Sequence, residues 1–338
     1  MKREAFLDSS KAIGILLVIL GHTYWIPNGL YALIYSFHMP LFFIISGYVY
    51  NDKKYGQYKF SRFAYGKFKA YIIPYLIFAA INLVLQIGYK FVFERTIIDG
   101  NYLITNLKGI LLCTANKENM PNCSPIWFLV ALFFATVVLW LILKYARKFA
   151  LVIATSAFLI SYAIYKIRGV NLPFKLSVLG TAVFFMYIGY VLRQYELLEK
   201  IIANKKRTVF VSIFIIAAGI AGYFNGGNVG LNENNYGYIG MFLIAAIGLS
   251  VAVLLLFKKC SFLNNELLSW FGKNTMYIMA FNYFMRDIAI EVYYMIPFVK
   301  NYTLHWIVLF LFTVVGCILA AVACGFVKNT FSKLLKTK

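Results

Sequence analysis

Ten segments of this chain are apolar enough, and long enough or nearly so, to cross a membrane as helices. Hydrophobic residues make up 62% of the 338 residues and charged residues only 13%, a composition that excludes an ordinary soluble domain. Because lipid offers no partners to backbone amides, such segments must fold as helices. We predict an all-α integral membrane protein whose residues 1–338 form a single domain. The ten segments are 10–27, 30–50, 70–92, 125–143, 149–165, 174–193, 208–224, 238–257, 268–288 and 304–327.

The positions of lysine and arginine predict how these segments are oriented. If the N-terminus lies in the cytoplasm, the inner connections are rich in basic residues, above all 51–69, whereas the outer connection 225–237 has none. We therefore predict that both termini face the cytoplasm, in a multi-pass protein of the plasma or inner membrane that contacts the lipid bilayer. The formal charge of +21 does not indicate a nucleic-acid partner, because the basic residues alternate with long apolar runs.

The first two segments each carry one histidine at membrane depth. His22 lies five residues before Pro27, where we expect a turn. His38 follows that turn, so both histidines are predicted to lie in the same, outer half of the bilayer. Ionisable side chains inside a bilayer are costly and by default mark functional sites. A structural histidine bonded to a neighbouring helix is the alternative, but two histidines in consecutive helices favour a functional role.

Two charged residues share the first helix with His22. Lys11 precedes His22 by 11 residues, or three helical turns, so both fall on one stripe roughly 16 Å apart along the axis. Asp8, three residues before Lys11, lies near the same stripe. The first helix is therefore predicted to present a charged pair at the inner face of the membrane and an imidazole deeper inside.

Motifs along the chain resemble the acyltransferase-3 family of membrane enzymes. KAIGILLVILGH at 11–22 resembles its opening signature, a basic residue, ten others and a histidine. SFHMPLFFIISGY at 36–48 resembles its second helix, most closely in the fucose 4-O-acetylase-like, polysaccharide O-acetyltransferase branch. Weaker resemblances follow in KFKAYIIPY, PIWFLVALF and FGKNTMYIMAFNYF. The resemblance thus runs from Asp8 to about Phe284, nearly the whole chain.

Two positions depart from the family's pattern. Many members have arginine where this chain has Lys11, so the two-pronged grip of a guanidinium on a carboxylate or phosphate is absent here. The late helix often ends in histidine, where this chain has Asn282. A hydrogen-bonding role can be carried over to Asn282, whereas a proton-transfer role cannot.

The resemblance implies an integral-membrane O-acyltransferase. Its donor would be cytoplasmic acetyl-CoA, and its acceptor a hydroxyl of an extracytoplasmic cell-envelope polysaccharide or lipid-linked glycan. His22 would act as general base on that hydroxyl or, alternatively, as a transient acyl carrier. His38 would orient His22 or donate to the developing oxyanion. Asp8 and Lys11 would order the inner end of the donor channel.

A basic cluster just before the third segment is the candidate donor site. Arg62, Lys67 and Lys69 stand where the resemblance places basic residues, and they would hold the phosphates of coenzyme A electrostatically. The alternative is that they only anchor the topology. Nothing in the chain resembles a P-loop or a GxGxxG turn, and no Cys/His spacing indicates a metal site.

Three residues are candidates for contact with the acceptor. Trp127, at the mouth of the fourth segment, would line a substrate cavity, unless it belongs to the interfacial aromatic belt. Asn282 and Arg286 approach the outer face on the ninth segment. The polar connection 225–237 could contact sugar hydroxyls or serve only as a flexible linker. In the outer connection 93–124, Cys113 and Cys123 could form a disulfide or remain two free thiols.

A transporter or flippase for a lipid-linked oligosaccharide is the rival function, with the histidines as a proton relay. Inverted repeats would favour that function, and none is visible in the sequence. A further alternative is a family branch that transfers another acyl group or acts on an amino acid.

Overall fold

The computed structural model describes residues 4–114, 124–167, 172–226, 229–296 and 305–336. Regular structure in these ranges is helical, apart from one isolated bridge between Gly230 and Asn235. The main helices are α1 Ala5–Gly21, α2 Asn28–Tyr48, α3 Asp52–Tyr55, α4 Phe60–Lys67, α5 Ile73–Tyr89, α6 Gly100–Leu112, α7 Trp127–Tyr145, α8 Ala150–Lys166, α9 Leu179–Gln194, α10 Leu197–Ile202, α11 Lys205–Tyr223, α12 Ile239–Lys259, α13 Glu266–Lys273, α14 Thr275–Met295 and α15 His305–Lys336. The all-α class is therefore as predicted.

Eight helical runs in the described ranges are long and apolar enough to cross a membrane. They match eight of the ten predicted segments, which confirms a multi-pass membrane protein; the count of ten and the orientation stay predictions. The other two segments are shorter or more polar: α1 has 17 residues, and α14 carries several polar and charged side chains. The eight runs are Asn28–Tyr48, Phe60–Glu94, Trp127–Tyr145, Arg147–Lys166, Pro173–Gln194, Lys205–Tyr223, Ile239–Lys259 and His305–Lys328.

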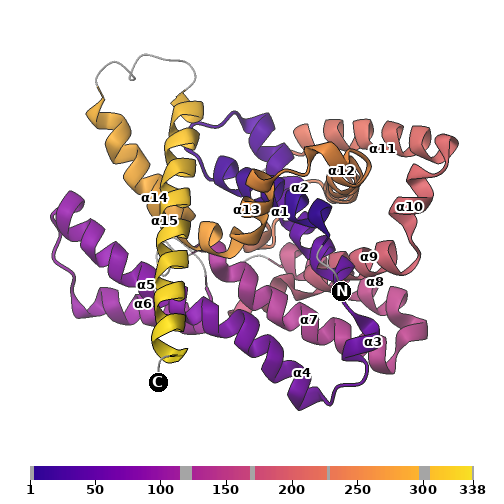
Figure 1. Ribbon diagram of the computed structural model, residues 1–338, viewed down its shortest axis with the longest axis horizontal. Helices are drawn as coiled ribbons and strands as arrows, with labels where there is room; N and C mark the ends of the chain where they lie inside the picture. The colour runs from indigo at the N-terminus through magenta and orange to yellow at the C-terminus, as the bar shows by residue number, and fades with distance from the viewer. Residues whose placement is uncertain (1–3, 115–123, 168–171, 227–228, 297–304, 337–338) are drawn as a thin grey trace.

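One predicted segment, 268–288, is wrong as a single helix. The structure breaks it at Asn274, which ends α13 and begins α14. The asparagine side chain there donates to the carbonyl of Trp270 at 2.8 Å. Asparagine competes for backbone hydrogen bonds and so favours a helix boundary over a helix interior. The break lets α13 lie against α1 while α14 runs in another direction (Figure 1).

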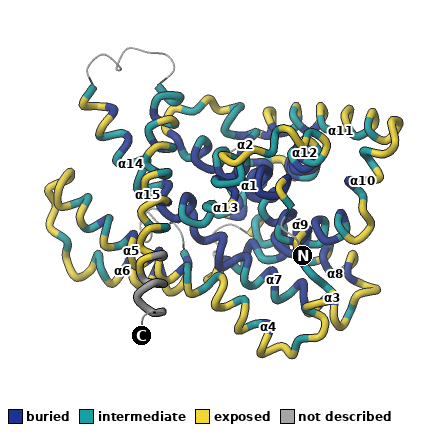
Figure 2. Tube along the Cα trace, in the orientation of Figure 1, coloured by how far each residue is buried: buried dark blue, intermediate teal, exposed yellow. Residues whose placement is uncertain are grey.

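Helices α1 and α2 occupy the centre of the molecule (Figure 1). Helix α1 packs on α2, α12, α13 and α14, and α2 packs on α9, α11 and α12. The buried residues gather in this centre, whereas α4, α6 and α11 are largely exposed (Figure 2). Large apolar side chains such as Phe210 on α11 and Leu319 on α15 point outward. Apolar side chains on an outer surface are what lipid contact requires.

The crossing of α2 and α9 depends on two glycines. A Cβ atom on Gly47 would overlap the backbone carbonyl of Met186, and one on Gly189 would overlap that of Ile44. Small residues at such a crossing let two membrane helices approach backbone to backbone. The crossing fixes the position of α2, the helix that carries His38.

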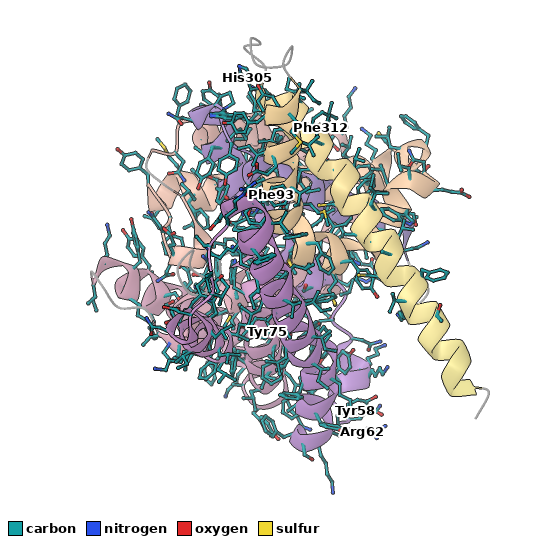
Figure 3. All side chains as sticks on the ribbon, turned by 90° about the vertical axis from the view of Figure 1, so that its left-hand side faces the viewer. Tyr58, Arg62, Tyr75, Phe93, His305 and Phe312 are labelled. Atoms are coloured by element: carbon teal, nitrogen blue, oxygen red, sulfur yellow. The ribbon has the colours of Figure 1, made fainter. Side chains whose placement is uncertain are left out.

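The helical run Phe60–Glu94 extends between two ends of the molecule that differ in charge. Tyr58 and Arg62 lie at one end, and Phe93 lies toward the other, where His305 is found (Figure 3). We call these the basic end and the far end. At the basic end, the Lys144 ammonium donates to the carbonyl of Tyr58 at 2.6 Å.

Candidate active site

The first part of the site forms where α13 meets α1. A Cβ atom on Gly272 would overlap the backbone of Asp8, so only glycine permits this contact. The buried carboxylate of Asp8 pairs with the ammonium of Lys11 at 3.5 Å. The predicted charged pair is thus present in the structure. The contact with α13 also brings Lys273 to the same cavity as Lys11.

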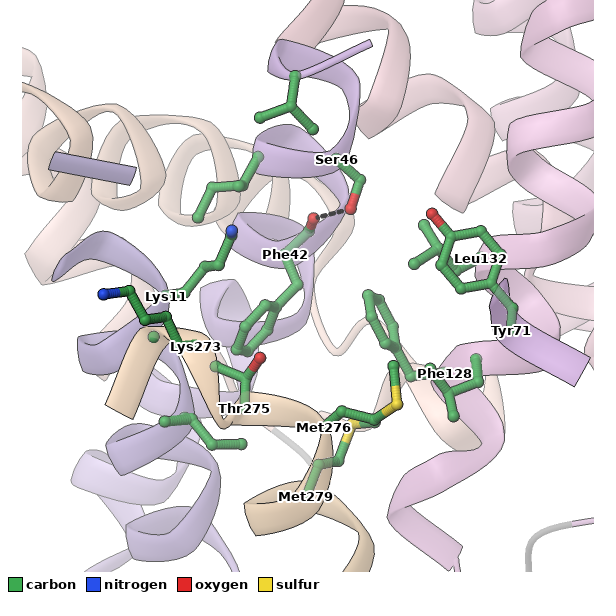
Figure 4. Close-up of a pocket in the computed structure, with 15 residues that line it drawn as sticks. Lys11, Phe42, Ser46, Tyr71, Phe128, Leu132, Lys273, Thr275, Met276 and Met279 are labelled. Atoms are coloured by element: carbon green, nitrogen blue, oxygen red, sulfur yellow. Dashed lines mark hydrogen bonds between the residues drawn. The ribbon is translucent and has the colours of Figure 1, made fainter. Parts of the chain in front are cut away.

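A cavity of about 320 Å³ opens beside these two lysines (Figure 4). We call it the basic cavity. Its lining combines Lys11, Lys273 and Thr275 with aromatic and aliphatic side chains. A cationic rim with an apolar interior suits a ligand that joins an anionic head to a thin, largely apolar arm. The apolar lining residues include Phe42, Ile45, Val49, Phe128, Leu129, Leu132, Met276 and Met279.

A second, smaller cavity of about 40 Å³ lies toward the far end. We call it the histidine cavity. His22, His38 and Trp127 all line it, so the structure brings these three predicted residues together. Its remaining walls are Val18, Tyr35, Met39, Pro125, Leu231, Asn232 and Met279. Met279 therefore lines both cavities and is a wall that they share.

The hydrogen bond made by His38 fixes which of its nitrogens carries the proton. Its Nδ1 lies 2.7 Å from the carbonyl oxygen of Ile34. A carbonyl only accepts, so Nδ1 must donate, and neutral His38 keeps a basic lone pair on Nε2. The ring is buried, and the Tyr35 ring packs edge-on against it with centroids 5.0 Å apart.

The Asn282 side chain holds His22 and can form a hydrogen bond with Nδ1 whether or not that nitrogen carries a proton. The Nδ1 of His22 lies 2.9 Å from Nδ2 of Asn282, the predicted polar residue on α14. In this orientation the amide donates to Nδ1. Turned by 180°, the same amide would accept from a protonated Nδ1 and leave Nε2 basic. The Oδ1 atom of Asn282 is buried and has no hydrogen-bond partner among the described residues.

Arg286, the third predicted acceptor residue, lies one turn beyond Asn282 and does not line either cavity. Its guanidinium stacks between the rings of Tyr24 and Tyr283, at 4.6 and 4.4 Å from their centroids, and pairs with Asp287. The Tyr283 ring in turn packs edge-on against His22, at 4.7 Å. Tyr283 thus contacts both Arg286 and His22.

The three predicted donor residues are not gathered at one point. Lys67 is half-buried, with its ammonium 4.6 Å from the Tyr55 ring and 5.8 Å from the ring of Tyr71, which lines the basic cavity. Arg62 and Lys69 are exposed. They stack on tyrosines of their own neighbourhood, Tyr58 and Tyr65.

A π-helical turn, Phe68–Ile72, connects Lys67 to the basic cavity. Such turns add one residue to a helical turn, re-aim the side chains near it and are frequent at functional sites. Here the turn contains Tyr71, whose side chain reaches the basic cavity (Figure 4).

Several residues of the two cavities carry no recognisable signal in the sequence. Tyr35 and Met279 look like ordinary apolar positions of membrane helices, and Leu231 and Asn232 belong to a connection. Lys273 could have been found, because it stands within the GKNT part of a family motif. Of the cysteine pair, Cys123 lies outside the described residues, while burial raises the pKa of Cys113 to about 11. Within the described ranges, no cluster of three or more His, Cys, Asp or Glu side chains could hold a metal.

Comparison with known proteins gives one match. A family model described as an acyltransferase domain, Acyl_transf_3, matches residues 4–322. No curated protein and no solved structure matches the chain. The matched span contains both cavities and all five sequence motifs.

Proposed function

We propose, from the premise that this chain belongs to the acyltransferase-3 family, that it moves an acetyl group from acetyl-CoA to a hydroxyl of a cell-envelope glycan. The family resemblance read from the motifs is thereby confirmed, and the chain is a membrane acyltransferase. The identity of the donor, the acceptor, the orientation in the membrane and the roles of individual residues are the content of the proposal.

The observation that best supports this proposal is that the same side chain, Met279, lines both cavities. An acyltransfer needs the donor's thioester carbon and the acceptor's oxygen within about 3–3.5 Å of each other, beside a proton acceptor. A donor that enters the basic cavity reaches the histidines past Met279. An acceptor approaches the same point from the far end, where Trp127 lines the histidine cavity.

The basic cavity would receive the coenzyme. Lys11 and Lys273 bind its phosphates as point charges, and Lys67, beside Tyr71, adds a third cation at the rim. The exposed Arg62 and Lys69 raise the local concentration of the anionic donor by long-range attraction. The pantetheine arm then lies along the apolar wall, so the basic end faces the cytoplasm, where acetyl-CoA is found.

The small volume of the histidine cavity favours a short acyl group. A cavity volume of roughly 10–15 Å³ is enough to hold one water molecule. About 40 Å³ therefore accommodates a group of a few heavy atoms, such as acetyl, and not a long acyl chain. Trp127 and Met279 are its bulky walls.

The chemistry is a one-step exchange at the thioester carbonyl. The acceptor hydroxyl loses its proton to Nε2 of His22 while its oxygen attacks the carbonyl carbon. The carbon–sulfur bond breaks, and the coenzyme thiolate takes a proton from His22, so an ester and a free thiol result. A general base of this kind contributes about 10²–10⁴-fold in rate.

Asn282 supports both states of this base. When His22 carries its proton on Nδ1, the buried Oδ1 of Asn282 can accept it, which leaves Nε2 free for the acceptor hydroxyl. His38 keeps a second basic nitrogen in the same cavity. We propose that the two imidazoles of this cavity hold a single proton between them during the reaction.

Enlarging the shared side chain tests the proposal. Met279→Trp fills the passage, so transfer of labelled acetyl from acetyl-CoA to envelope glycan should fall to background while acetyl-CoA still binds. Met295→Trp, on the exposed end of the same helix, is the control and should transfer normally. Normal transfer by Met279→Trp would refute the proposed route. Absence of transfer by the unaltered protein would refute the proposed reaction.

A further inference from the structure

The connection before α12 is a packed element of the far end and not a flexible linker. We call residues 229–238 the cap. Val229, Leu231, Asn234 and Tyr236 of the cap are buried. Its glycine-rich sequence therefore hides an apolar and hydrogen-bonded inner side.

Polar contacts attach the cap to two helices. The Asn234 amide donates to the carbonyl of Ser161 on α8 at 2.9 Å. The Tyr236 hydroxyl donates to Oδ1 of Asn234 at 2.5 Å, so the hydroxyl of Thr181 on α9 must be the donor in its own 2.5 Å contact with Tyr236. Such a fully connected network holds one conformation.

The inner side of the cap is a wall of the histidine cavity. Leu231 and Asn232 line this cavity together with His22, His38 and Trp127. An acceptor whose hydroxyl reaches either histidine must therefore pass along these two cap residues. The carboxamide of Asn232 offers both a donor and an acceptor, the pair of groups that neighbouring sugar hydroxyls require.

One buried lysine joins the cap to two other segments. Lys175 is only 8% exposed. Its ammonium donates to the carbonyl of Asn232 at 3.0 Å and to the carbonyl of Thr114 at 2.7 Å. Three segments that are far apart in the sequence thus meet at one charge. A buried charge is costly unless it is hydrogen-bonded, so this position is not an incidental place for a lysine.

The backbone at Lys175 has a strained conformation. Phe174 and Lys175 have φ angles of 56° and 57°, in the left-handed region that bulky residues seldom adopt. Strain of this kind persists only where the surroundings impose it, and it is frequent at functional sites. Here it turns the lysine side chain inward, toward Thr114 and Asn232.

We propose that the cap is the acceptor-recognition wall of the active site and that Lys175 is the residue that positions it. This inference rests on the proposed acyl transfer to a glycan hydroxyl. Without the ammonium, the carbonyls of Thr114 and Asn232 lose their charged donor, and the cap moves away from the histidines. The acceptor is then bound poorly, while the donor, held in the basic cavity, is bound as before.

Chemical labelling of the histidines tests the positioning without any assay of activity. Diethyl pyrocarbonate modifies accessible neutral imidazoles, and mass spectrometry resolves the rate at each histidine. In Lys175→Met we expect labelling of His22 and His38 to accelerate about tenfold, because the two charged hydrogen bonds that close the cap are gone. The third histidine, His305, lines neither cavity and is the internal reference.

Two control variants separate a positioning role from loss of the fold. Lys144→Met removes a similar bond, from a lysine to the carbonyl of Tyr58 at 2.6 Å, but at the basic end. It should leave histidine labelling unchanged. Lys175→Arg keeps a charged donor and should restore slow labelling. Unchanged labelling of His22 and His38 in Lys175→Met, at an unchanged melting temperature, would refute the role of Lys175.

Kinetics test the recognition role of the cap. Using acetyl-CoA with the methyl glycosides of common hexoses, we expect Lys175→Met to raise the acceptor KM about tenfold and leave the donor KM unchanged. Asn232→Ala keeps the backbone carbonyl and hence the contact with Lys175. It should raise the acceptor KM without accelerating histidine labelling. Asn232→Ala therefore tests the recognition role even if Lys175→Met fails to fold.

The outcomes distinguish this inference from the proposed function. Faster labelling with an unchanged acceptor KM would refute the recognition role while leaving the positioning role intact. If the unaltered protein neither transfers nor hydrolyses the acetyl group, the proposed function fails, and the labelling experiment still decides whether Lys175 positions the cap.

Discussion

The histidine cavity and the basic cavity differ in how their side chains are held. Both histidines are fixed by a hydrogen bond to a named partner, Ile34 or Asn282, and by edge-on aromatic rings. The basic cavity, by contrast, is far larger, about 320 Å³ against about 40 Å³, and its two cations are ammonium groups on long side chains. Proton transfer requires fixed nitrogens, whereas a flexible ammonium can hold a phosphate without fixed geometry.

The largest expected effect is the loss of acetyl transfer, with donor binding kept, when the proposed base in the histidine cavity is replaced. His22→Gln keeps a donor and an acceptor at similar reach but cannot shuttle a proton near neutral pH. We expect acetyl transfer to fall about 10²–10⁴-fold, with acetyl-CoA binding preserved. His305→Gln is the control and should transfer at the normal rate. If His22→Gln retains most of the activity, the imidazole only positions the acceptor.

The next expected effect concerns the glycine that builds the basic cavity. Gly272→Ala drives a methyl group into the backbone of Asp8 and separates α13 from α1. We expect a loss of stability of about 1–3 kcal/mol, as for other overpacked sites, together with weaker acetyl-CoA binding. Gly240→Ala, on α12, meets nothing within 4 Å and should be neutral in a thermal unfolding assay. Equal behaviour of the two variants would contradict the close approach.

A third prediction compares two sets of cations. Replacing Lys11 and Lys273 together by glutamine should weaken acetyl-CoA binding about tenfold, because both line the basic cavity. Replacing the exposed Arg62 and Lys69 should slow association at low salt and change the equilibrium affinity little. Titration of each double variant with acetyl-CoA decides this. The reverse pattern would place the phosphates at Arg62 and Lys69, two of the residues that the sequence alone had suggested.

The smallest expected effect is a pH dependence at Glu199, on α10. Burial raises the pKa of Glu199, but the hydrogen bond from Lys258 at 2.7 Å outweighs it, and the net pKa lies below 4.5. A lowered carboxyl pKa stabilises the fold above the unfolded-state value, and that contribution is lost as pH falls through the lowered pKa. Glu199→Gln should therefore melt slightly below the unaltered protein at pH 6, and the difference should vanish in more acidic buffer. A difference that persists there would contradict this assignment.

Sequence alone identified most of the elements and the family. Apolar length predicted ten spanning segments, eight of which correspond to long apolar helical runs in the structure, and the spacing of the motifs predicted the family. Within the site, the sequence selected His22, His38 and Trp127, which line one cavity. It also selected Asp8 and Lys11, which form an ion pair. His22, His38, Asp8 and Lys11 could be selected because ionisable side chains are so unfavourable in lipid that each one is informative.

The tertiary structure alone decided which distant residues complete the site. Arg62 and Lys69 have the right charge, yet their helix leaves them exposed, while Lys273 reaches the cavity because Gly272 allows α13 to touch α1. The cap is polar and rich in glycine, and only its packing shows that Leu231 and Asn232 face the histidines. Local sequence fixes hydrophobicity and helix boundaries, but it does not specify which carbonyl a lysine 57 residues away will bind, as Lys175 binds that of Asn232. That choice depends on how the helices pack.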